Sequence, residues 1–532
     1  MSDNKKGQNF FHGAAIYTIG IIIVKILGAI YKMPLGNILG DDGFTHFDVT
    51  YKIYNVFLTI STAGFPVAMS RLISESDTVN RERQVCRVFH VGILTFLGLG
   101  AFGTLVMLLF PAELASWMGD VQATQCLFVM APSVVLVCVA AAYRGYAQGH
   151  ADMIPTTVSQ VIETAVKVVV GLSCAAILHA MGKSVAICAV GAILGTTVSS
   201  LAAMLYMQIK VHRKYQVNPP ESEASDVPDP KRKILWDLLR IGIPITISTS
   251  IMSLIQLADS KITLSQLQNA AGYTASAAYV LNGVYAKAMT IYNVPSAFVV
   301  PFVSTVVPAI SAARVKNDRL GACDIAEGAM RLCTLICLPM AVGMAVLAEP
   351  CMNVIYPNSA SQGAVLLCEL GVTCYFMAMS LMTNAILPAN GNERLPLISI
   401  SLGAITKVAV TYFLVGNPDI NVYGAPIGTS CCYIVMLTVN LIFMARKMAR
   451  PMNLGRIFIR TAASCAVMGV AAWAVWSLLR SLMSSTLIPL GIAVIVGVVV
   501  YAVMIIATRA VTMEDMKLIP KGEKLGRLLH IR

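Results

Sequence analysis

The chain has 532 residues, of which 57% are apolar and 12% charged, and its formal net charge is +12. An ordinary soluble domain carries roughly 25% charged residues, so this composition excludes a soluble globular protein and indicates an integral membrane protein. The excess of Lys and Arg requires no nucleic acid, because positive charge gathers in the cytoplasmic loops of membrane proteins.

Runs of about 20 apolar residues, the length that crosses a bilayer, occur fourteen times and predict an all-α polytopic membrane protein. In chain order the predicted spans are 12–36, 46–72, 88–110, 122–143, 153–179, 185–209, 234–260, 277–310, 325–348, 362–388, 395–415, 423–445, 457–479 and 486–508. The first run lacks a small-residue cleavage site, so we interpret it as a span and not as a removed signal peptide.

Lys and Arg residues are concentrated in the connections on one side of the predicted spans. The segment before the first span, the connections after every second span and the tail from Arg509 hold almost all of the Lys and Arg residues that lie outside the spans. The opposite connections hold only Lys183, Lys261 and Arg480. This pattern predicts that both termini are cytoplasmic. A polybasic surface of this kind is expected to bind anionic membrane lipids.

The chain contains an internal duplication. The phrase G-A-x-x-G-T-[ST] begins at Gly191 and again at Gly424, 233 residues later, and four further matches recur after 238 to 242 residues. Each copy holds six spans, an even number, so both copies have the same orientation, as in transporters with parallel repeats. The small residues of the phrase are expected to allow close helix packing. The predicted domains are a first lobe over 1–210, a cytoplasmic linker over 211–233, a second lobe over 234–447, two further spans within 448–508 and a basic cytoplasmic tail over 509–532.

Three prolines interrupt the predicted span 277–310. Pro295, Pro301 and Pro308 each remove a backbone donor and clash with the preceding turn, so the span is expected to be kinked or broken and to act as a hinge. The alternative is that neighbouring helices satisfy the freed carbonyl groups and that no hinge exists.

The first, second and eighth predicted spans contain four lysines, and a charge at a helix centre costs about 2.5–3.5 kcal/mol. At a rise of about 1.5 Å per residue, Lys25 lies about 20 Å into its span, Lys287 about 15 Å and Lys52 about 9 Å. Lys32 lies near the end of its span, where its side chain can reach the interface. A cavity lined by lysines favours an anionic substrate such as a phosphate or pyrophosphate, unless backbone carbonyls satisfy each lysine. The candidate substrate ligands are Lys25, Lys52, Lys287, Lys32, Asn55 and Asn293.

Two acidic residues in the first copy have a lysine four residues later. Glu163 precedes Lys167 on one helix face, which favours a neutralising pair with a packing role. Asp48 and Lys52 have the same spacing and are also expected to share a helix face.

The second copy departs from this arrangement. Lys407 repeats Lys167 but has Gly403 in the place of an acid, so Glu369 of the tenth predicted span is its candidate partner. An ionisable group inside a span is a candidate for ion coupling as well as for charge pairing. The candidates for these two roles are Asp259, Glu163, Lys167, Glu369 and Lys407.

No pattern in the sequence points to catalysis, to a metal site or to a cofactor. The seven His residues form no H-x-x-x-H pair, and the chain has no G-x-S-x-G, no Walker loop and no long outer loop. The fourteen Cys residues show neither metal-ligand spacing nor a disulfide framework. Transport is therefore expected to be driven by an ion gradient, the membrane potential or a substrate gradient, with a proton or a monovalent cation as the candidate ion.

Several segments resemble those of a known family. They are V-K-I-L-G over 24–28, Y-K-M-P-L over 31–35, L-G-D-D-G over 39–43, Y-K-I-Y over 51–54, S-T-A-G-F-P-V-A over 61–68 and R-G-Y-A-Q-G over 144–149. These segments are similar to those of the stage V sporulation protein B group in the polysaccharide-biosynthesis branch of the multidrug/oligosaccharidyl-lipid/polysaccharide (MOP) flippase superfamily. The resemblance covers essentially the whole chain, including the layout of six, six and two spans.

The resemblance implies a MOP/MATE-like fold and an alternating-access flippase in the bacterial cell membrane. Its implied substrate is an undecaprenyl-pyrophosphate-linked saccharide, and the peptidoglycan precursor lipid II is the first candidate. In the related MurJ-type lipid II flippases, arginines on spans 1, 2 and 8 are tied to the substrate. Lys25 stands at the first of these positions and Lys52 at a cationic position of span 2, so the charge is kept and the bidentate geometry of Arg is lost. The last two spans would line a groove for the lipid tail.

Three alternatives remain open. The first is an exporter of lipid-linked teichoic-acid, capsule or exopolysaccharide units. The second is an ion-coupled multidrug exporter of the MATE type, which would require a net acidic cavity. The third is a non-transporting protein, such as a glycan polymerase or a scaffold for cell-wall synthases, which would require large outer loops or exposed catalytic acids. The expected partners of a flippase are a lipid-linked pyrophosphate glycan, anionic lipids and cell-wall synthases.

Overall fold

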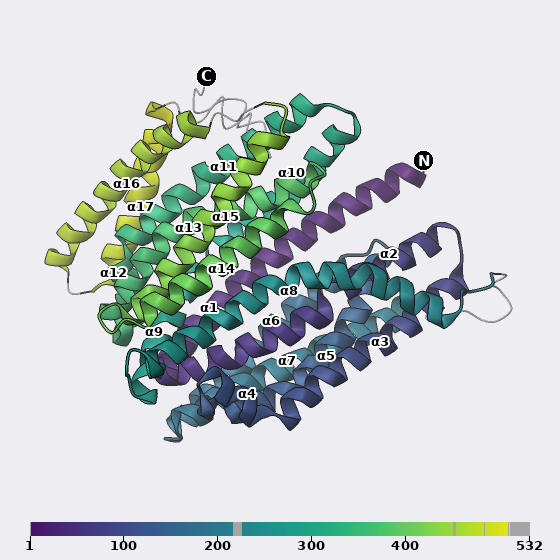
Figure 1. Cartoon of the computed structure of the whole chain (residues 1–532), viewed down its shortest axis with the longest axis horizontal. Helices are drawn as coiled ribbons and strands as arrows, with labels where there is room; N and C mark the ends of the chain where they lie inside the picture. The colour runs from purple at the N-terminus through teal and green to yellow at the C-terminus, as the bar shows by residue number, and fades with distance from the viewer. Residues whose placement is uncertain (1, 216–225, 451–453, 484, 509, 511–532) are drawn as a thin grey trace. The chain divides into compact units, whose positions relative to one another are not determined.

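The computed structural model describes residues 2–215, 226–450, 454–483, 485–508 and 510 of the chain. All regular structure in these residues is helical, and no strand occurs among them. The predicted all-α polytopic fold is therefore confirmed (Figure 1). Apart from Ala510, the basic tail predicted over 509–532 lies outside the described residues, and so does the part of the predicted linker over 216–225.

The chain divides into two compact units, and the boundary falls inside a helix. Unit 1 comprises Met1–Gln268 and Tyr273–Gly283, and unit 2 comprises Asn269–Gly272 and Val284–Arg532. The helices up to the boundary are α1 (Ser2–Thr62), α2 (Phe65–Thr78), α3 (Glu82–Leu109), α4 (Pro111–Met118), η1 (Val121–Ala123), α5 (Thr124–Gly149), α6 (Ile154–Ala180), α7 (Val185–Lys214), α8 (Lys231–Asn269) and α9 (Ala275–Tyr292), which contains it.

Unit 2 continues with helices that surround a core of buried apolar residues on α10, α11, α13 and α15. The helices are α10 (Ser296–Val315), α11 (Arg319–Val346), α12 (Ala348–Ile355), η2 (Pro357–Ser359), α13 (Ala360–Ala389), α14 (Leu395–Val415), η3 (Asn421–Tyr423), α15 (Gly424–Lys447), α16 (Leu454–Leu482) and α17 (Leu487–Ala507). α16 packs against both α17 and α11. The lobe boundaries that the internal repeat predicts stay a prediction.

Twelve segments of the described chain are long and apolar enough to cross a membrane, whereas the sequence predicts fourteen spans. The first segment, Ile19–Thr78, is 60 residues long and contains most of the first two predicted spans. The predicted span 277–310 corresponds to two helices, α9 and α10, and not to one long apolar helix. The protein is thus a multi-pass membrane protein. The two counts differ because the first two predicted spans fall in one apolar segment, which is broken at Gly40, and because the span 277–310 is divided between two helices, as its prolines predict.

The long helix α1 is bent at Gly40, which separates its first two predicted spans. Gly40 has a φ of 67° and a ψ of −168° inside an otherwise helical segment. A φ in this range is accessible to glycine and strained for residues with a Cβ atom. The bend divides α1 into a first half that carries Lys25 and a second half that carries Lys52.

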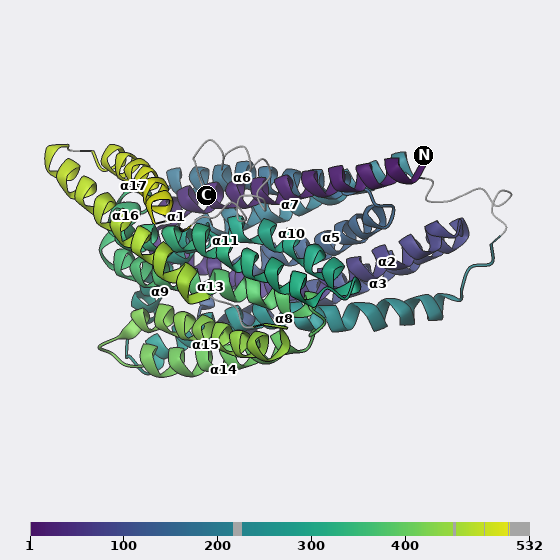
Figure 2. The ribbon, with the colours of Figure 1, turned by 90° about the horizontal axis from the view of Figure 1, so that it is seen from above.

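The repeated phrase marks close helix packing in both copies. A Cβ atom at Gly195 of α7 would lie 2.4 Å from Cα of Gly171 in α6. A Cβ atom at Gly424 of α15 would lie 2.6 Å from Cβ of Leu414 in α14. α6 packs on α7, and α14 packs on α15, as Figure 2 shows for the second pair. The prediction that these small residues allow close packing is confirmed.

Gly195→Ala is expected to destabilise unit 1 by about 1–3 kcal/mol, because the added methyl group meets the α6 backbone. Gly98→Ala in α3 is the matched control, since a Cβ atom at Gly98 meets no atom within 4 Å. The control is expected to be neutral or stabilising by up to about 1 kcal/mol, because alanine favours a helix over glycine. Thermal unfolding in detergent compares the two variants, and equal midpoints would contradict this packing.

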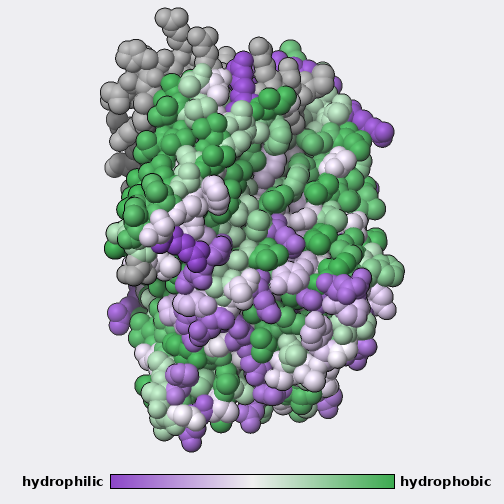
Figure 3. Space-filling view, turned by 90° about the vertical axis from the view of Figure 1, so that its left-hand side faces the viewer, coloured by the Kyte–Doolittle hydropathy of each residue, from purple (hydrophilic) through white to green (hydrophobic). Residues whose placement is uncertain are grey.

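Large apolar side chains are exposed along the spans, as expected of helices that face lipid. Val498 and Val499 of α17 and Phe102 of α3 are largely exposed. Figure 3 shows hydrophobic residues at the surface over wide parts of the face in view, with patches of hydrophilic residues among them. Exposed apolar surface on this scale is unusual for a soluble protein and fits the hydrocarbon core of a bilayer.

The connection between α5 and α6 is held to the end of α7 by polar contacts. Asp152 accepts a hydrogen bond from Tyr215 Oη at 2.8 Å and forms an ion pair with Lys214. Burial by itself raises the pKa of Asp152, but the hydrogen bonds from Lys214 and Tyr215 outweigh burial and leave this pKa below its usual value. The carboxylate form of Asp152 is therefore stabilised in the folded state.

Asp152→Asn is expected to lower the free energy of unfolding at about pH 7, by less than about 1 kcal/mol because the pair is partly exposed. Since the folded-state pKa of Asp152 is lowered, its contribution is present above the unfolded-state pKa of about 3.9 and is lost as the pH falls through the folded-state pKa. The difference between wild type and variant should thus shrink below about pH 4. Unfolding midpoints over a pH series test this, and an undiminished difference at about pH 2 would contradict it.

Candidate functional site

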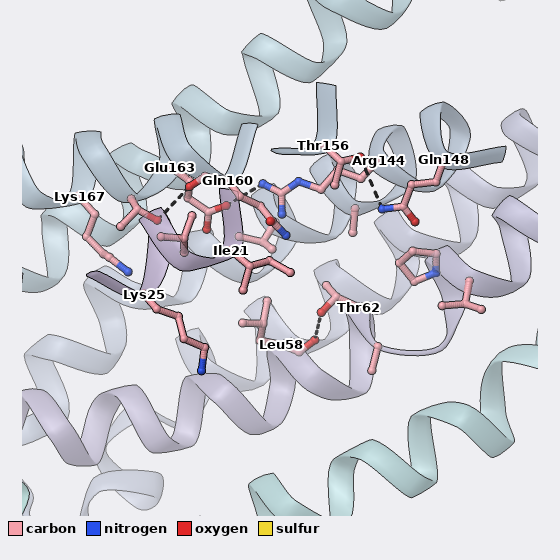
Figure 4. Close-up of a pocket in the computed structure, with 17 residues that line it drawn as sticks. Ile21, Lys25, Leu58, Thr62, Arg144, Gln148, Thr156, Gln160, Glu163 and Lys167 are labelled. Atoms are coloured by element: carbon pink, nitrogen blue, oxygen red, sulfur yellow. Dashed lines mark hydrogen bonds and ion pairs between the residues drawn. The ribbon is translucent and has the colours of Figure 1, made fainter. Parts of the chain in front are cut away.

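A cavity of about 520 Å³ lies within unit 1, lined by both halves of α1 and by α2, α5 and α6. Figure 4 shows side chains from these helices around it. Apolar side chains of α1, α2 and α5 form part of the wall. The polar and charged side chains that line it are Lys25, Thr62, Arg144, Gln148, Thr156, Gln160, Glu163, Thr164 and Lys167.

The helical repeat of α6 brings its polar residues to one face. They follow one another at spacings of three and four residues, as Thr156, Gln160, Glu163 and Lys167. Side chains at these spacings lie along one stripe of an α-helix. Arg144 and Gln148 of α5 are also four residues apart. Two otherwise apolar spans therefore contribute a polar wall.

The centre of this wall is an ion pair between α5 and α6. Arg144 Nη2 donates to Glu163 Oε2 at 2.7 Å and to Ser159 Oγ at 2.8 Å. Only 12% of the Arg144 side chain and 23% of the Glu163 side chain are exposed, so water screens the pair weakly. The partner of Glu163 is thus Arg144, and not Lys167 as the spacing predicts. A pair four residues apart on one helix contributes only about 0.2–0.5 kcal/mol, so a contact between helices can replace it.

Lys167 is held by aromatic residues from both halves of α1. Its Nζ atom donates a hydrogen bond to Tyr51 Oη at 3.1 Å. The same atom lies 5.6 Å from the ring centroid of Tyr51 and 5.9 Å from that of Tyr31. The negative faces of aromatic rings attract a cation at such distances. Lys167 therefore connects α6 to α1 on either side of the bend.

Positive charge exceeds negative charge among the described residues that line the cavity. Lys25, Arg144 and Lys167 are cationic, whereas Glu163 is the one acid among these lining residues. Figure 4 shows Lys25 and Lys167 at one end of the cavity, Gln148 at the other, and the pair of Arg144 and Glu163 between them. Such a wall favours an anion, and the planar fork of Arg suits a phosphate or a carboxylate.

The other two predicted lysines of α1 are not among the residues that line this cavity. Lys52 Nζ lies 2.6 Å from Asp48 Oδ2, so the two residues share a helix face as their spacing predicts. Lys32 Nζ lies 5.7 Å from the ring centroid of Tyr51. The structure therefore brings Lys25, but neither Lys32 nor Lys52, to the cavity wall.

Lys287 belongs to unit 2 and is only 1% exposed there. Its Nζ atom donates to Ser359 Oγ at 3.1 Å and lies 5.4 Å from the ring centroid of Tyr356. The side chain is thus buried between α9 and the segment before α13. Its predicted contact with substrate stays a prediction.

The remaining predicted site residues are dispersed over several helices. Asn55 of α1 is partly buried, while Asn293, just after α9, is exposed. Asp259 of α8 and Lys407 of α14 are buried. Glu369 of α13 is partly buried, and its Oε2 atom has no hydrogen-bond partner among the described residues. The roles of these five residues stay predictions.

The predicted break in the span 277–310 is present. α9 ends at Tyr292 and α10 begins at Ser296, with Pro295 as its N-cap residue. Pro301 and Pro308 lie inside α10. The break is confirmed at Pro295, and the hinge role of the three prolines stays a prediction.

Several residues of the cavity are not among those that the sequence singles out. Arg144, Gln148 and Gln160 belong to this group, although Arg144 and Gln148 lie in one of the segments that carry the family resemblance. The signal that could have found them is spacing, because polar residues recur every three or four positions at the end of one predicted span and the start of the next.

A second buried polar cluster of unit 1 was also not predicted. His46 Nδ1 lies 2.7 Å from Asp120 Oδ2, and His46 Nε2 lies 3.4 Å from Asp42 Oδ1. His46 and Asp120 are fully buried, and the ring of Tyr279 packs edge-on against His46. No group of three or more His, Cys, Asp or Glu among the described residues could hold a metal ion. The hydrogen bond between His46 and Asp120 fixes α1 to the start of η1.

Comparisons with known proteins agree with the resemblance in the sequence. The family model described as polysaccharide biosynthesis protein matches residues 10–314. The chain is 25% identical over 528 residues to the uncharacterized membrane protein YabM of Bacillus subtilis (strain 168), covering 98% of this chain and 97% of YabM. It is 24% identical over 421 residues to stage V sporulation protein B of the same organism, covering 79% and 80%. It is 21% identical over 456 residues to the lipid II flippase MurJ of that organism, covering 82% and 83%.

Solved structures share the fold. A lipid II flippase MurJ in an inward closed conformation matches with a TM-score of 0.66 at 15% identity, over 93% of this chain and 97% of that chain. An inward-facing multidrug resistance MATE family transporter of the MOP superfamily matches with a TM-score of 0.64 at 17% identity, over 80% and 97%. The predicted MOP/MATE-like fold is therefore confirmed.

Proposed function

Because the chain belongs to the polysaccharide biosynthesis protein family, we propose that it is a flippase for a lipid-linked saccharide, with undecaprenyl-pyrophosphate-linked lipid II as the first candidate substrate. One of its relatives supports this class of function, since it is named a lipid II flippase, and another is named a sporulation protein. The identities of 21% and 24% leave the saccharide itself a matter for experiment.

The observation that carries this proposal is the charge of the cavity in unit 1. Lys25, Arg144 and Lys167 face a space of about 520 Å³, and Glu163 offsets only one of these charges. A pyrophosphate headgroup brings negative charge and acceptor oxygens, which match the guanidinium fork and the two ammonium groups. Gln148 and Gln160 add neutral hydrogen-bonding groups for the adjacent sugar.

In the proposed cycle the headgroup enters the polar cavity, and the prenyl tail stays in the lipid. The apolar surface of α16 and α17 is the proposed groove for the tail. Alternating access then exposes the headgroup to the other side of the membrane. The substrate shifts the population of the two states only as far as its affinity for them differs.

A flipping measurement tests this proposal. The purified protein is reconstituted into vesicles with a fluorescent lipid II, and the label in the outer leaflet is destroyed by a membrane-impermeant reductant. With a functional flippase the protected fraction falls toward zero, because inner-leaflet lipid reaches the reductant. A protected fraction equal to that of protein-free vesicles, in membranes that keep an imposed potential, would overturn the assignment to lipid II.

Two transport functions remain as alternatives. An exporter of other lipid-linked units, such as teichoic-acid, capsule or exopolysaccharide precursors, would use the same headgroup chemistry and would flip those lipids in the same measurement. An ion-coupled multidrug exporter is favoured by the likeness of the fold to MATE transporters. The cationic cavity opposes it, because cationic drugs would be repelled by Lys25 and Lys167.

The orientation and the partners complete the proposal. We place both termini in the cytoplasm, from the asymmetry of Lys and Arg. Anionic lipids contact the basic connections, and cell-wall synthases receive the product. A proton, a monovalent cation or the membrane potential drives the cycle.

A further inference from the structure

We propose that Glu163 is a resident counter-anion of the cavity, which holds Arg144 until an anionic headgroup takes its place and then pairs with Lys167. This inference rests on the proposed function, because it concerns how the same cavity accepts a pyrophosphate. It assigns to Glu163 a role in setting affinity and release, beyond packing.

The first step follows from the hydrogen bonds of Arg144. In the structure its Nη2 atom bonds to Glu163 Oε2 at 2.7 Å and to Ser159 Oγ at 2.8 Å, and its Nε atom bonds to Ser159 Oγ at 3.2 Å. A phosphate binds a guanidinium through two adjacent N–H groups, and both possible pairs include Nη2, which in Arg144 is already bonded to Glu163 and Ser159. A headgroup that uses Arg144 must therefore compete with Glu163, and Ser159 keeps the guanidinium in place while the anions exchange.

The second step concerns the carboxylate that has been displaced. Two anions beside one guanidinium repel each other, so Glu163 must find another cation when the headgroup binds. Lys167 lies four residues later on the same helix, within the reach of such a pair. Both residues line the same cavity, so the Glu163 carboxylate can move from Arg144 to Lys167 without leaving the cavity wall.

The third step links this exchange to α1. Lys167 now donates to Tyr51 Oη at 3.1 Å and lies near the rings of Tyr51 and Tyr31, which stand on opposite sides of the Gly40 bend. When Lys167 turns toward Glu163, it gives up this hydrogen bond to Tyr51. Binding of the headgroup to Arg144 thus weakens a contact between α6 and α1. The pairing of Glu163 with Arg144 and its pairing with Lys167 are two alternative states, and the headgroup shifts their populations toward the second.

The test measures binding of inorganic pyrophosphate to the full-length protein in detergent by isothermal titration calorimetry. Glu163→Gln removes the competing anion and keeps the side-chain shape, so it is expected to bind about tenfold more tightly than wild type. Tyr51→Phe releases Lys167 and is expected to bind a few-fold more tightly. In the Glu163→Gln background, Tyr51→Phe is expected to cause no further gain in affinity for pyrophosphate, because no carboxylate remains with which Lys167 could pair.

A matched control and a transport measurement separate this role from a general charge effect. Glu75→Gln removes an exposed acid of α2, paired with Arg71, and is expected to leave the affinity within about twofold of wild type. In reconstituted vesicles Glu163→Gln is expected to lower both KM and kcat of flipping, because the variant binds the headgroup more tightly and releases it more slowly. If Glu163→Gln does not fold, Glu163→Asp shortens the side chain, weakens the pair and is expected to bind more tightly than wild type.

The outcomes distinguish this inference from the proposed function. Wild type that binds pyrophosphate while Glu163→Gln binds equally or more weakly would overturn the counter-anion role and leave the flippase proposal standing. Wild type and Glu163→Gln that both fail to bind pyrophosphate, yet bind a lipophilic cation, would overturn both. Additive effects of Glu163→Gln and Tyr51→Phe would overturn the exchange with Lys167.

Discussion

His46→Ala is expected to destabilise unit 1 by about 3–5 kcal/mol, which is among the largest effects of a single substitution in this protein. Both ring nitrogens of His46 face carboxylates, with Asp120 at 2.7 Å and Asp42 at 3.4 Å. His46 and Asp120 have no exposed side-chain surface. The alanine variant leaves the two carboxylates without the group that lies between them, and a buried charge without its partner is costly.

The matched control is a solvent-exposed ion pair in the same unit. Arg71 and Glu75 form a pair at 2.8 Å in which both side chains are more than half exposed. Arg71→Ala is therefore expected to change the free energy of unfolding by less than about 0.5 kcal/mol. Chemical unfolding in detergent micelles compares both variants with wild type. Equal losses for His46→Ala and Arg71→Ala would show that the buried network contributes no more than an exposed pair.

Arg144→Gln combined with Lys25→Gln is expected to reduce flipping of a pyrophosphate-linked lipid by at least about a hundredfold. In the proposed cycle each residue supplies a charge-assisted contact to the headgroup, and such contacts contribute about 1.5–3 kcal/mol each. The lipid-linked precursor should then accumulate on the cytoplasmic side of cells that depend on this protein. Mass spectrometry of the precursor pool, with the labelled lipid in vesicles, measures both consequences.

The control for this double variant is Lys210→Gln, which removes an exposed cation near the end of α7. It is expected to flip the lipid at the wild-type rate and to keep the wild-type unfolding midpoint, whereas the double variant is expected to have a lower midpoint, because Glu163 loses its partner Arg144. If Arg144→Gln with Lys25→Gln retained full flipping with normal folding, the cavity of unit 1 would not be the headgroup site.

The fold could be predicted from the sequence because its main determinants are local. Apolar runs of about 20 residues define the spans, and the break at Pro295 follows from a missing backbone donor. The repeated G-A-x-x-G-T-[ST] phrase correctly indicated close packing at Gly195 and Gly424. The break between the first two spans also follows from the sequence, because Gly40 lies between the two apolar runs and has a non-helical backbone in the structure.

The site could be predicted only in part, because its pairings depend on contacts between helices. Lys25 was found as a charge deep in an apolar run, and it lines the cavity. The partner of Glu163 could not be read from spacing along α6, since Arg144 approaches from α5. His46 and Asp120 are 74 residues apart in the chain, and each alone resembles an ordinary polar residue near the end of a span.

The most direct test of the account is to identify the lipid that co-purifies with the protein in mild detergent, by native mass spectrometry followed by lipid analysis. The account predicts an undecaprenyl-pyrophosphate-linked saccharide bound to wild type and lost in Arg144→Gln combined with Lys25→Gln. Ordinary phospholipids alone, or the same lipid-linked saccharide retained by the double variant, would contradict the claim that this cationic cavity binds a pyrophosphate headgroup.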